Sequence, residues 1–76
     1  MSADHQAESA DVDSTVGARL REMRHRHQMP ARQVADLAQV SSAYLSRLEN
    51  GKLSPTVGTL TRIVQAMGES VATLFQ

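Results

Sequence analysis

The sequence predicts an all-α protein, with a compact domain of five short helices at residues 14–76 behind a disordered acidic tail at residues 1–13. Apolar residues recur at steps of three and four through most of the chain, which is the spacing of a helix face. No segment shows the alternation of apolar and polar residues that marks a strand. At 76 residues without a cysteine, the chain is one small domain with no disulfide and no thiolate zinc site.

The first 13 residues differ in composition from the rest. They carry four acidic and no basic side chains, and their only branched aliphatic residue is Val12, so they cannot bury a face. The other residues hold all eight Lys and Arg against four acidic side chains. The basic domain gains affinity for phosphate by releasing counterions. We expect the tail to be a solubilising leader, and the alternative is an arm that weakens non-specific contacts with nucleic acid.

The first helix is expected to begin after an N-cap at Ser14 or Thr15 and to run to about His27. One stripe on this helix is expected to face the core, and it consists of Val16, Leu20, Met23 and His27. Pro30 opens the second helix, because proline fits the first helical turn, where its missing N–H is no loss.

The stretch Gln33–Gly51 contains two helix patterns joined by a short turn. Ser41 is the expected N-cap of the third helix, and Gly51 suits its end, where the chain needs a left-handed residue. The apolar residues of the pair share one side: Val34, Ala35, Ala38, Leu45 and Leu48. A helix held from behind and bare in front suits the major groove of DNA, which is about 12 Å wide. The pattern therefore predicts a helix-turn-helix unit.

Two more helices are expected after this unit. Thr56 is the expected N-cap of the fourth helix, which ends before Gly68, and Ser70 is the expected N-cap of the last one. The residues expected to point inward are Val57, Leu60, Ile63, Val64 and Met67 in the fourth helix, and Val71, Leu74 and Phe75 in the last.

Over residues 16–75 the sequence resembles the lambda-repressor-like helix-turn-helix domain of the Xre family, which includes Cro and phage repressors. The resemblance rests on the order and spacing of LRxxR at 20–24, VADLA at 34–38, VSSAYLSRLENG at 40–51, SPT at 54–56 and the capped last helix. It implies a transcriptional regulator, a repressor, that binds double-stranded DNA sequence-specifically with its third helix, residues 42–49, in the major groove. The run SPTVGTLTRI is most similar to family members that carry a small-molecule-sensing cupin domain after this one.

The resemblance also bears on assembly. The chain stops at Gln76, where such a domain ends, so it is either a stand-alone domain or, as we favour, the N-terminal piece of a longer ligand-sensing regulator. Any small-molecule effector would act through that following domain. A homodimer is implied, joined near Leu74 and Phe75 or by the following domain. It would bind a near-palindromic operator with recognition helices about 34 Å apart.

The resemblance assigns base reading to the outer side of the third helix, at Ser42, Ala43, Ser46 and Arg47. Arg47 is the main candidate because arginine pairs bidentately with guanine, although a phosphate contact is the alternative. Phosphate contacts are implied at Arg32, Gln33, Ser41, Tyr44, Asn50, Lys52, Ser54 and Thr56. For Tyr44, packing beside Leu48 is the alternative. Arg24 and Glu49 match a charged pair that ties the first helix to the third in this family.

Three residues depart from the family pattern. The family usually has Ser or Thr where this chain has Pro30, a phosphate-binding glutamine where it has Ala31, and often glycine where it has Gln39. A left-handed residue other than glycine at that corner would cost about 1 kcal/mol. These departures affect the expected list of DNA contacts and leave the expected fold unchanged.

Other functions find little support in the sequence. There is no Cys–His pair, paired carboxylate or glycine-rich phosphate loop, so neither an enzyme nor a cofactor or metal site is expected. No apolar run approaches the roughly 20 residues that span a bilayer, and no secretion signal is present. A cytoplasmic protein without membrane contact is expected. The alternative is a protein-interaction module of the same fold, such as an antitoxin or an adaptor.

Overall fold

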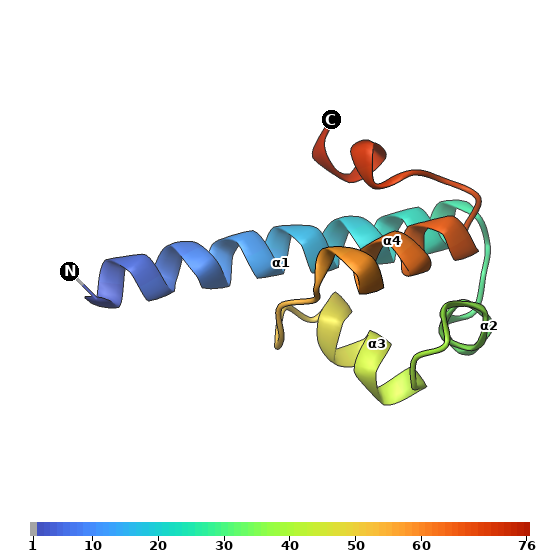
Figure 1. The fold of residues 1–76 in the computed structure, drawn as a ribbon, viewed down its shortest axis with the longest axis horizontal. Coiled ribbons are helices and arrows are strands. Elements are labelled where there is room, and N and C mark those ends of the chain that lie inside the picture. Colours follow the sequence, from blue (N-terminus) through green and yellow to red (C-terminus); the bar gives the residue numbers. More distant parts are fainter. Residues whose placement is uncertain (1) are drawn as a thin grey trace.

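The computed structural model describes the backbone of residues 2–76 and the side chains of residues 12–76. Within this part the chain forms four α-helices, a 3₁₀ helix and no strand: α1 (Ser2–Arg26), α2 (Ala31–Ala38), α3 (Ser42–Glu49), α4 (Val57–Ala66) and η1 (Val71–Phe75). α3 packs on α1 and α2, α2 packs on α4, and η1 lies against α1 and α4 (Figure 1). The all-α prediction is confirmed, with four α-helices and a 3₁₀ turn in place of five helices.

The core lies where α1 to α4 and η1 meet. Its buried apolar side chains are Val16, Leu20, Met23, Val34, Ala35, Ala38, Leu45, Leu48, Leu60, Ile63, Val64, Met67 and Leu74. Every one of these was expected from the helical spacing of the sequence. The interiors of the four helices are therefore predicted correctly, and the errors fall at the ends of the elements.

Three residues expected inside lie on the surface. His27 follows the last residue of α1 and contacts the carboxylate of Glu69. Val57 is the first residue of α4 and is 75% exposed, because no preceding turn covers it. Phe75 is 61% exposed. In a 3₁₀ helix only residues three apart share a face, so Leu74 can be buried while Phe75 turns outward.

The first helix starts earlier than expected. It begins at Ser2, so Ser14 and Thr15 lie inside α1 and neither is its N-cap. Residues 2–13 include four alanines or glutamines and no glycine or proline, so nothing in them stops a helix. Figure 1 shows this part of α1 projecting beyond the other elements. The side chains of residues 2–11 lie outside the described part, so the disorder predicted for residues 1–13 stays a prediction, as does the domain boundary at residue 14.

All four α-helices end in the same backbone motif. A left-handed residue follows each helix. Its own N–H donates to the carbonyl three residues earlier, and the N–H of the next residue donates to the carbonyl five residues before that one. The left-handed residues are Gln28 (φ 54°), Gln39 (61°), Gly51 (70°) and Gly68 (75°). The expected role of Gly51 is confirmed, and Gln39 adopts the left-handed corner without being glycine.

The helix starts are more varied. Ser41 Oγ accepts a hydrogen bond from the Tyr44 N–H at 3.0 Å, and Thr56 Oγ1 accepts one from the Thr59 N–H at 3.1 Å, as expected. Pro30 is itself the N-cap of α2, in an extended conformation, and does not lie in the first turn. Ser70 precedes η1 without a side-chain capping bond. No helix in the described residues is both long and apolar enough to cross a membrane.

Candidate nucleic-acid interface

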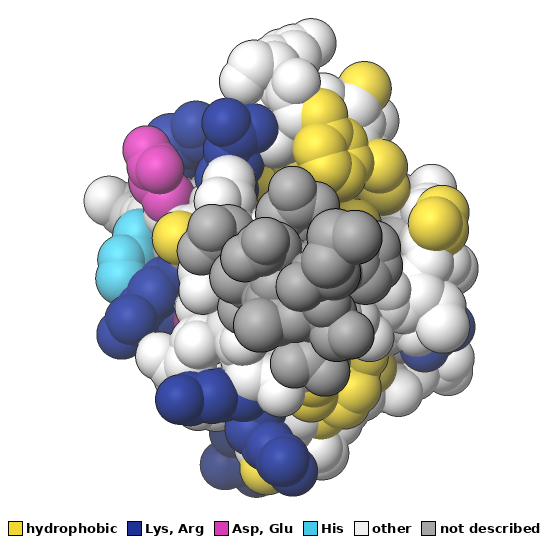
Figure 2. All heavy atoms as spheres, turned by 90° about the vertical axis from the view of Figure 1, so that its left-hand side faces the viewer, with side chains coloured by type: hydrophobic (Ala, Val, Ile, Leu, Met, Phe, Trp, Pro, Cys, Tyr) yellow, Lys and Arg dark blue, Asp and Glu magenta, His cyan; other side chains and the backbone are white. Residues whose placement is uncertain are grey.

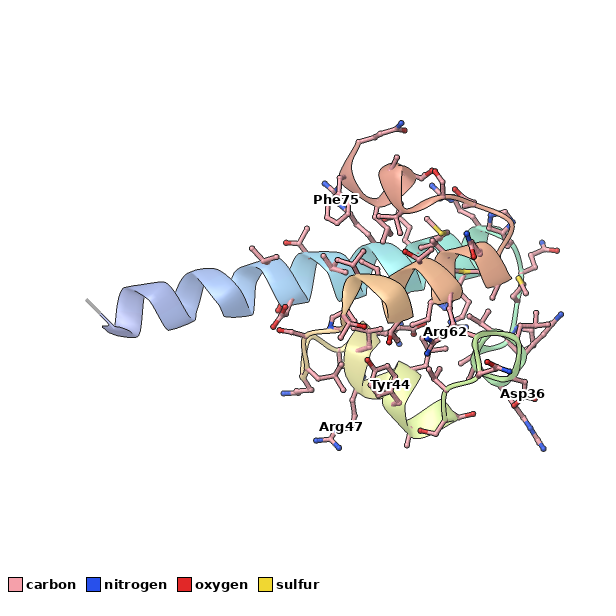
Figure 3. The ribbon with its side chains drawn as sticks, in the orientation of Figure 1. Asp36, Tyr44, Arg47, Arg62 and Phe75 are labelled. Atoms are coloured by element: carbon pink, nitrogen blue, oxygen red, sulfur yellow. The ribbon has the colours of Figure 1, made fainter. Side chains whose placement is uncertain are left out.

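α3 separates a buried side from a polar outer side. Leu45, Leu48 and Glu49 are buried against the rest of the molecule. The outer side carries the four residues to which base reading was assigned, all of them exposed: Ser42, Ala43, Ser46 and Arg47. Figure 3 shows Arg47 pointing away from the body of the protein. α3 thus presents one continuous small, polar stripe with a single long cationic side chain.

Gly17 sets how closely α3 approaches α1. A Cβ atom at this position would lie 2.3 Å from the carbonyl oxygen of Leu48 and 2.9 Å from that of Glu49, both of them backbone atoms. Only glycine permits this contact. The sequence reasoning missed Gly17, although a glycine inside a helix pattern, which costs about 1 kcal/mol, signals a packing or functional reason.

A bidentate ion pair joins α1 to α3 beside this contact. Arg24 Nε lies 2.8 Å from Glu49 Oε2 and Arg24 Nη2 lies 3.0 Å from Glu49 Oε1, with the two side chains only 12% and 6% exposed. Arg24 Nη1 also donates to the carbonyl of Met29 at 3.1 Å. Hydrogen bonding to Glu49 raises the pKa of Arg24 above its usual value, against the opposing effect of burial. The pair therefore fixes α1, α3 and the connection to α2 relative to one another.

The loop after α3 lies against the middle of α1. A Cβ atom at Gly51 would lie 2.8 Å from Ser14 Oγ, and Ser54 Oγ donates to Asp13 Oδ2 at 2.5 Å. The Ser54 hydroxyl, to which phosphate binding was assigned, therefore already donates its hydrogen bond to the Asp13 carboxylate. Asn50 also has an internal partner, since its Nδ2 donates to the Ser46 carbonyl at 2.8 Å.

The remaining assigned residues are placed differently. Tyr44 is half-buried and packs against the core, while its hydroxyl has no partner within the described part. Arg32 and Gln33, on the first turn of α2, and Lys52, after α3, are exposed. The start of α2, the outer side of α3 and the loop after α3 each contribute an exposed cation.

The eight basic side chains fall into two sets of four. Arg19 donates to the carbonyl of Leu74, Arg24 pairs with Glu49, Arg26 lies 3.5 Å from Glu69, and Arg62 donates to the carbonyl of Ala38 at 3.1 Å. The other set forms no hydrogen bond or ion pair within the described part of the chain: Arg21, Arg32, Arg47 and Lys52. Figure 2 shows Lys and Arg side chains along one flank and at the lower edge of the molecule.

Two short helices joined by a tight turn, with the second exposed along a polar stripe, define a helix-turn-helix domain. Residues 15–74 match the helix-turn-helix domain family, and the chain belongs to this family.

The chain is similar to proteins described as regulators. The HTH-type transcriptional regulator DdrOP3 of Deinococcus deserti is 36% identical over 58 residues, which are 76% of this chain and 45% of that protein. The chain thus spans less than half the length of that relative. Two crystal structures of the clp gene regulator ClgR from Corynebacterium glutamicum are similar, with TM-scores of 0.80 and 0.81 at 34% and 33% identity. The matches cover 82% and 83% of this chain and 80% and 67% of those chains.

Proposed function

We propose that this chain is the DNA-binding domain of a transcriptional regulator and that it docks α3 in the major groove of double-stranded DNA. One observation carries the proposal. The side chains on the outer side of α3 form no hydrogen bond or ion pair within the described residues. Unpaired cations lie before and after this helix, at Arg32 and Lys52. Membership of the helix-turn-helix family and the regulator relatives support it.

Base reading falls to the stripe on α3. Ser42, Ala43 and Ser46 are small, so the axis of α3 can lie deep in the groove, and the Ala43 methyl can meet a thymine methyl. Arg47 is long, exposed and unpaired, so its guanidinium is free to bind the acceptor edge of guanine. One such bidentate contact discriminates between bases by about 1–3 kcal/mol.

Phosphate binding positions this stripe without reading sequence. Arg32, Gln33 and Lys52 supply exposed donors on the two sides of α3, and free N–H groups at the starts of α2 and α3 add partial positive charge. The same role is proposed for Ser41, Tyr44, Asn50, Ser54 and Thr56. Ser54 is the weakest of these, because a phosphate would have to displace the carboxylate of Asp13.

We further propose that the protein acts as a homodimeric repressor on a near-palindromic operator. A single domain with one reading helix makes too few base contacts for a specific site. Two copies related by a two-fold axis would place their α3 helices about 34 Å apart, one turn of DNA. The isolated domain is then expected to bind weakly and with a steep dependence on salt.

A backbone amide NMR titration with a mixed-sequence duplex, at low and then raised salt, tests the proposal. Shifts are expected at Arg32, from Ser41 to Arg47 and from Lys52 to Thr56, and they should fade as salt rises. Arg47→Gln should weaken binding and reduce the preference between operators. If the amides of α3 do not respond, docking in the groove is wrong and a protein-interaction module, such as an antitoxin or adaptor, becomes the better interpretation.

A further inference from the structure

We infer that Arg21 on α1 is a further phosphate-binding residue, so that the DNA contact extends from α3 and its loop onto the side of the first helix. The inference rests on the proposed function and adds a residue to that interface. Neither the sequence pattern nor the family resemblance assigned any DNA contact to α1.

The first step is the pairing of the arginines on α1. Arg19, Arg24 and Arg26 each have a partner elsewhere in the fold, at η1, α3 and Glu69 respectively. Arg21 is exposed and has no hydrogen bond or ion pair within the described residues. The fold therefore gives a reason for three of the four arginines and none for Arg21.

The second step is the direction of the Arg21 side chain. Gly17 touches the backbone of α3 and Arg24 binds Glu49, so these two residues mark the side of α1 that faces α3. Arg21 follows Gly17 by four residues and precedes Arg24 by three, so it projects from nearly the same side. It lines one surface hollow together with Glu49, and the same hollow is also lined by Glu22 and Arg26. Arg21 therefore lies near the C-terminal end of α3, about two turns along α1 from Asp13 and Ser14, which the loop carrying Lys52 contacts.

The third step is the charge around this end of α3. Glu49 is neutralised by Arg24, so it does not compete for Arg21. Glu22 lines the same hollow as Arg21, but it projects about 100° farther round α1 and forms no ion pair with Arg21 or any other residue of the described part. In Figure 2 Lys and Arg side chains lie along one flank, with acidic and His side chains among them, and at the lower edge.

Exposed, unpaired cations on several elements around α3 suit an extended polyanion. Duplex DNA carries one negative charge per about 1.7 Å of helix axis, so a duplex docked on α3 offers separate phosphates to Arg47, Lys52 and Arg21. A single small anion would be held by one or two of these residues. The geometry thus favours the flanking DNA backbone as the ligand of Arg21.

The test is the salt dependence of DNA affinity for the full chain and its Arg21→Gln variant. The variant should bind at least threefold more weakly at low salt, and its log–log salt slope should fall by about 0.9, with base preference unchanged. Arg21→Lys should retain the slope. Arg26→Gln is the control, since it removes the same charge from the same helix at a position about 140° round from Arg21, where the side chain pairs with Glu69, and it should leave binding unchanged.

Arg47→Gln, measured in parallel, separates the two proposals. If Arg47→Gln weakens binding and Arg21→Gln does not, the inference about Arg21 is wrong while groove docking stands. If neither variant changes binding, the proposed function itself fails. Equal weakening by Arg21→Gln and Arg26→Gln would show a general effect of net charge, which also overturns a specific contact by Arg21.

Discussion

α2 and α3 are both eight residues long and end in the same left-handed motif, but their ends differ in chemistry. α3 is capped at its start by the Ser41 hydroxyl and is followed by the left-handed Gly51, and each residue is of a type well suited to its place. α2 starts after Pro30 without a side-chain capping bond and is followed by the left-handed Gln39, whose positive φ costs conformational energy that glycine would not incur. The proposed reading helix thus has the better local signals, and its supporting helix has the poorer ones.

Different interactions also hold the two helices in the fold. α2 lies between α3 and α4, and its Val34, Ala35 and Ala38 are at most 1% exposed, so apolar burial holds it. α3 is held in addition by the backbone contact at Gly17 and the ion pair of Glu49. Apolar burial alone allows a helix to rotate slightly about its axis, whereas the backbone contact at Gly17 and the ion pair of Glu49 each require one orientation of α3. The helix proposed to present side chains to DNA is the one whose orientation is fixed.

The largest effect on stability is expected from breaking the ion pair between Arg24 and Glu49. Glu49→Ala strands the guanidinium of Arg24, which is only 12% exposed, and should lower the free energy of unfolding by about 3 kcal/mol. Urea denaturation measures this. Glu22→Ala removes an exposed carboxylate from α1 and should change stability by less than about 0.5 kcal/mol. A loss below about 1 kcal/mol for Glu49→Ala would mean that the pair behaves as a surface ion pair.

The next effect concerns the contact between α1 and α3. In Gly17→Ala the new Cβ meets backbone atoms that cannot rotate away, so the helices must separate, at about 2 kcal/mol. Gly58→Ala in α4 is the control, since its Cβ would meet only Thr56 Oγ1 at 4.0 Å and should gain about 0.5 kcal/mol from helix propensity. Thermal denaturation of the pair should give opposite signs, and a stable Gly17→Ala protein would contradict the close approach.

A smaller effect tests the local signals of α3. Ser41→Ala removes the capping acceptor and should lower the free energy of unfolding by about 1 kcal/mol. The start of α3 would then lack a side-chain cap, as the start of α2 does. Amide hydrogen exchange in the first turn of α3 should quicken at Tyr44. Ser42→Ala, one residue later, removes a hydroxyl with no partner in the described residues and should leave exchange unchanged.

The smallest effect should improve α2. Gln39→Gly relieves the left-handed strain of about 1 kcal/mol, but the greater freedom of glycine in the unfolded chain returns part of it, for a net gain near 0.5 kcal/mol. Chemical denaturation detects such a gain. Gln65→Gly, at an exposed position inside α4, should instead cost about 1 kcal/mol, and an equal loss in both variants would exclude strain at Gln39.

The features that the sequence predicted correctly are local ones. The spacing that buries Leu20, Leu45 and Ile63, and the caps at Ser41 and Thr56, depend only on residues within one or two turns. The misplaced residues depend on where an element starts or which helix it is. Ser14 could have been an N-cap only if the chain before it stopped being helical, and Phe75 turns outward because η1 has three residues per turn.

The candidate site divides in the same way. The exposure of Arg47 follows from the phase of α3 and needs no tertiary information. The contact between Ser54 and Asp13 joins residues 41 apart in the chain, and Gly17 owes its role to the backbone of another helix. Arg19 and Arg26 find their partners at Leu74 and Glu69, which are distant in sequence, whereas Arg21 finds none in the described part. This difference among the arginines of α1 is therefore visible only in the folded chain.

The bare outer side of α3 has a consequence for how such proteins diversify. Ser42, Ala43, Ser46 and Arg47 contribute no side-chain bond to the described fold, and the core uses only the opposite side of the helix. Substitutions at exposed positions of this kind usually change stability by less than about 0.5 kcal/mol. Four positions of one scaffold can therefore be changed almost independently of folding, which, under the proposed base reading, lets duplicated copies acquire different target sequences.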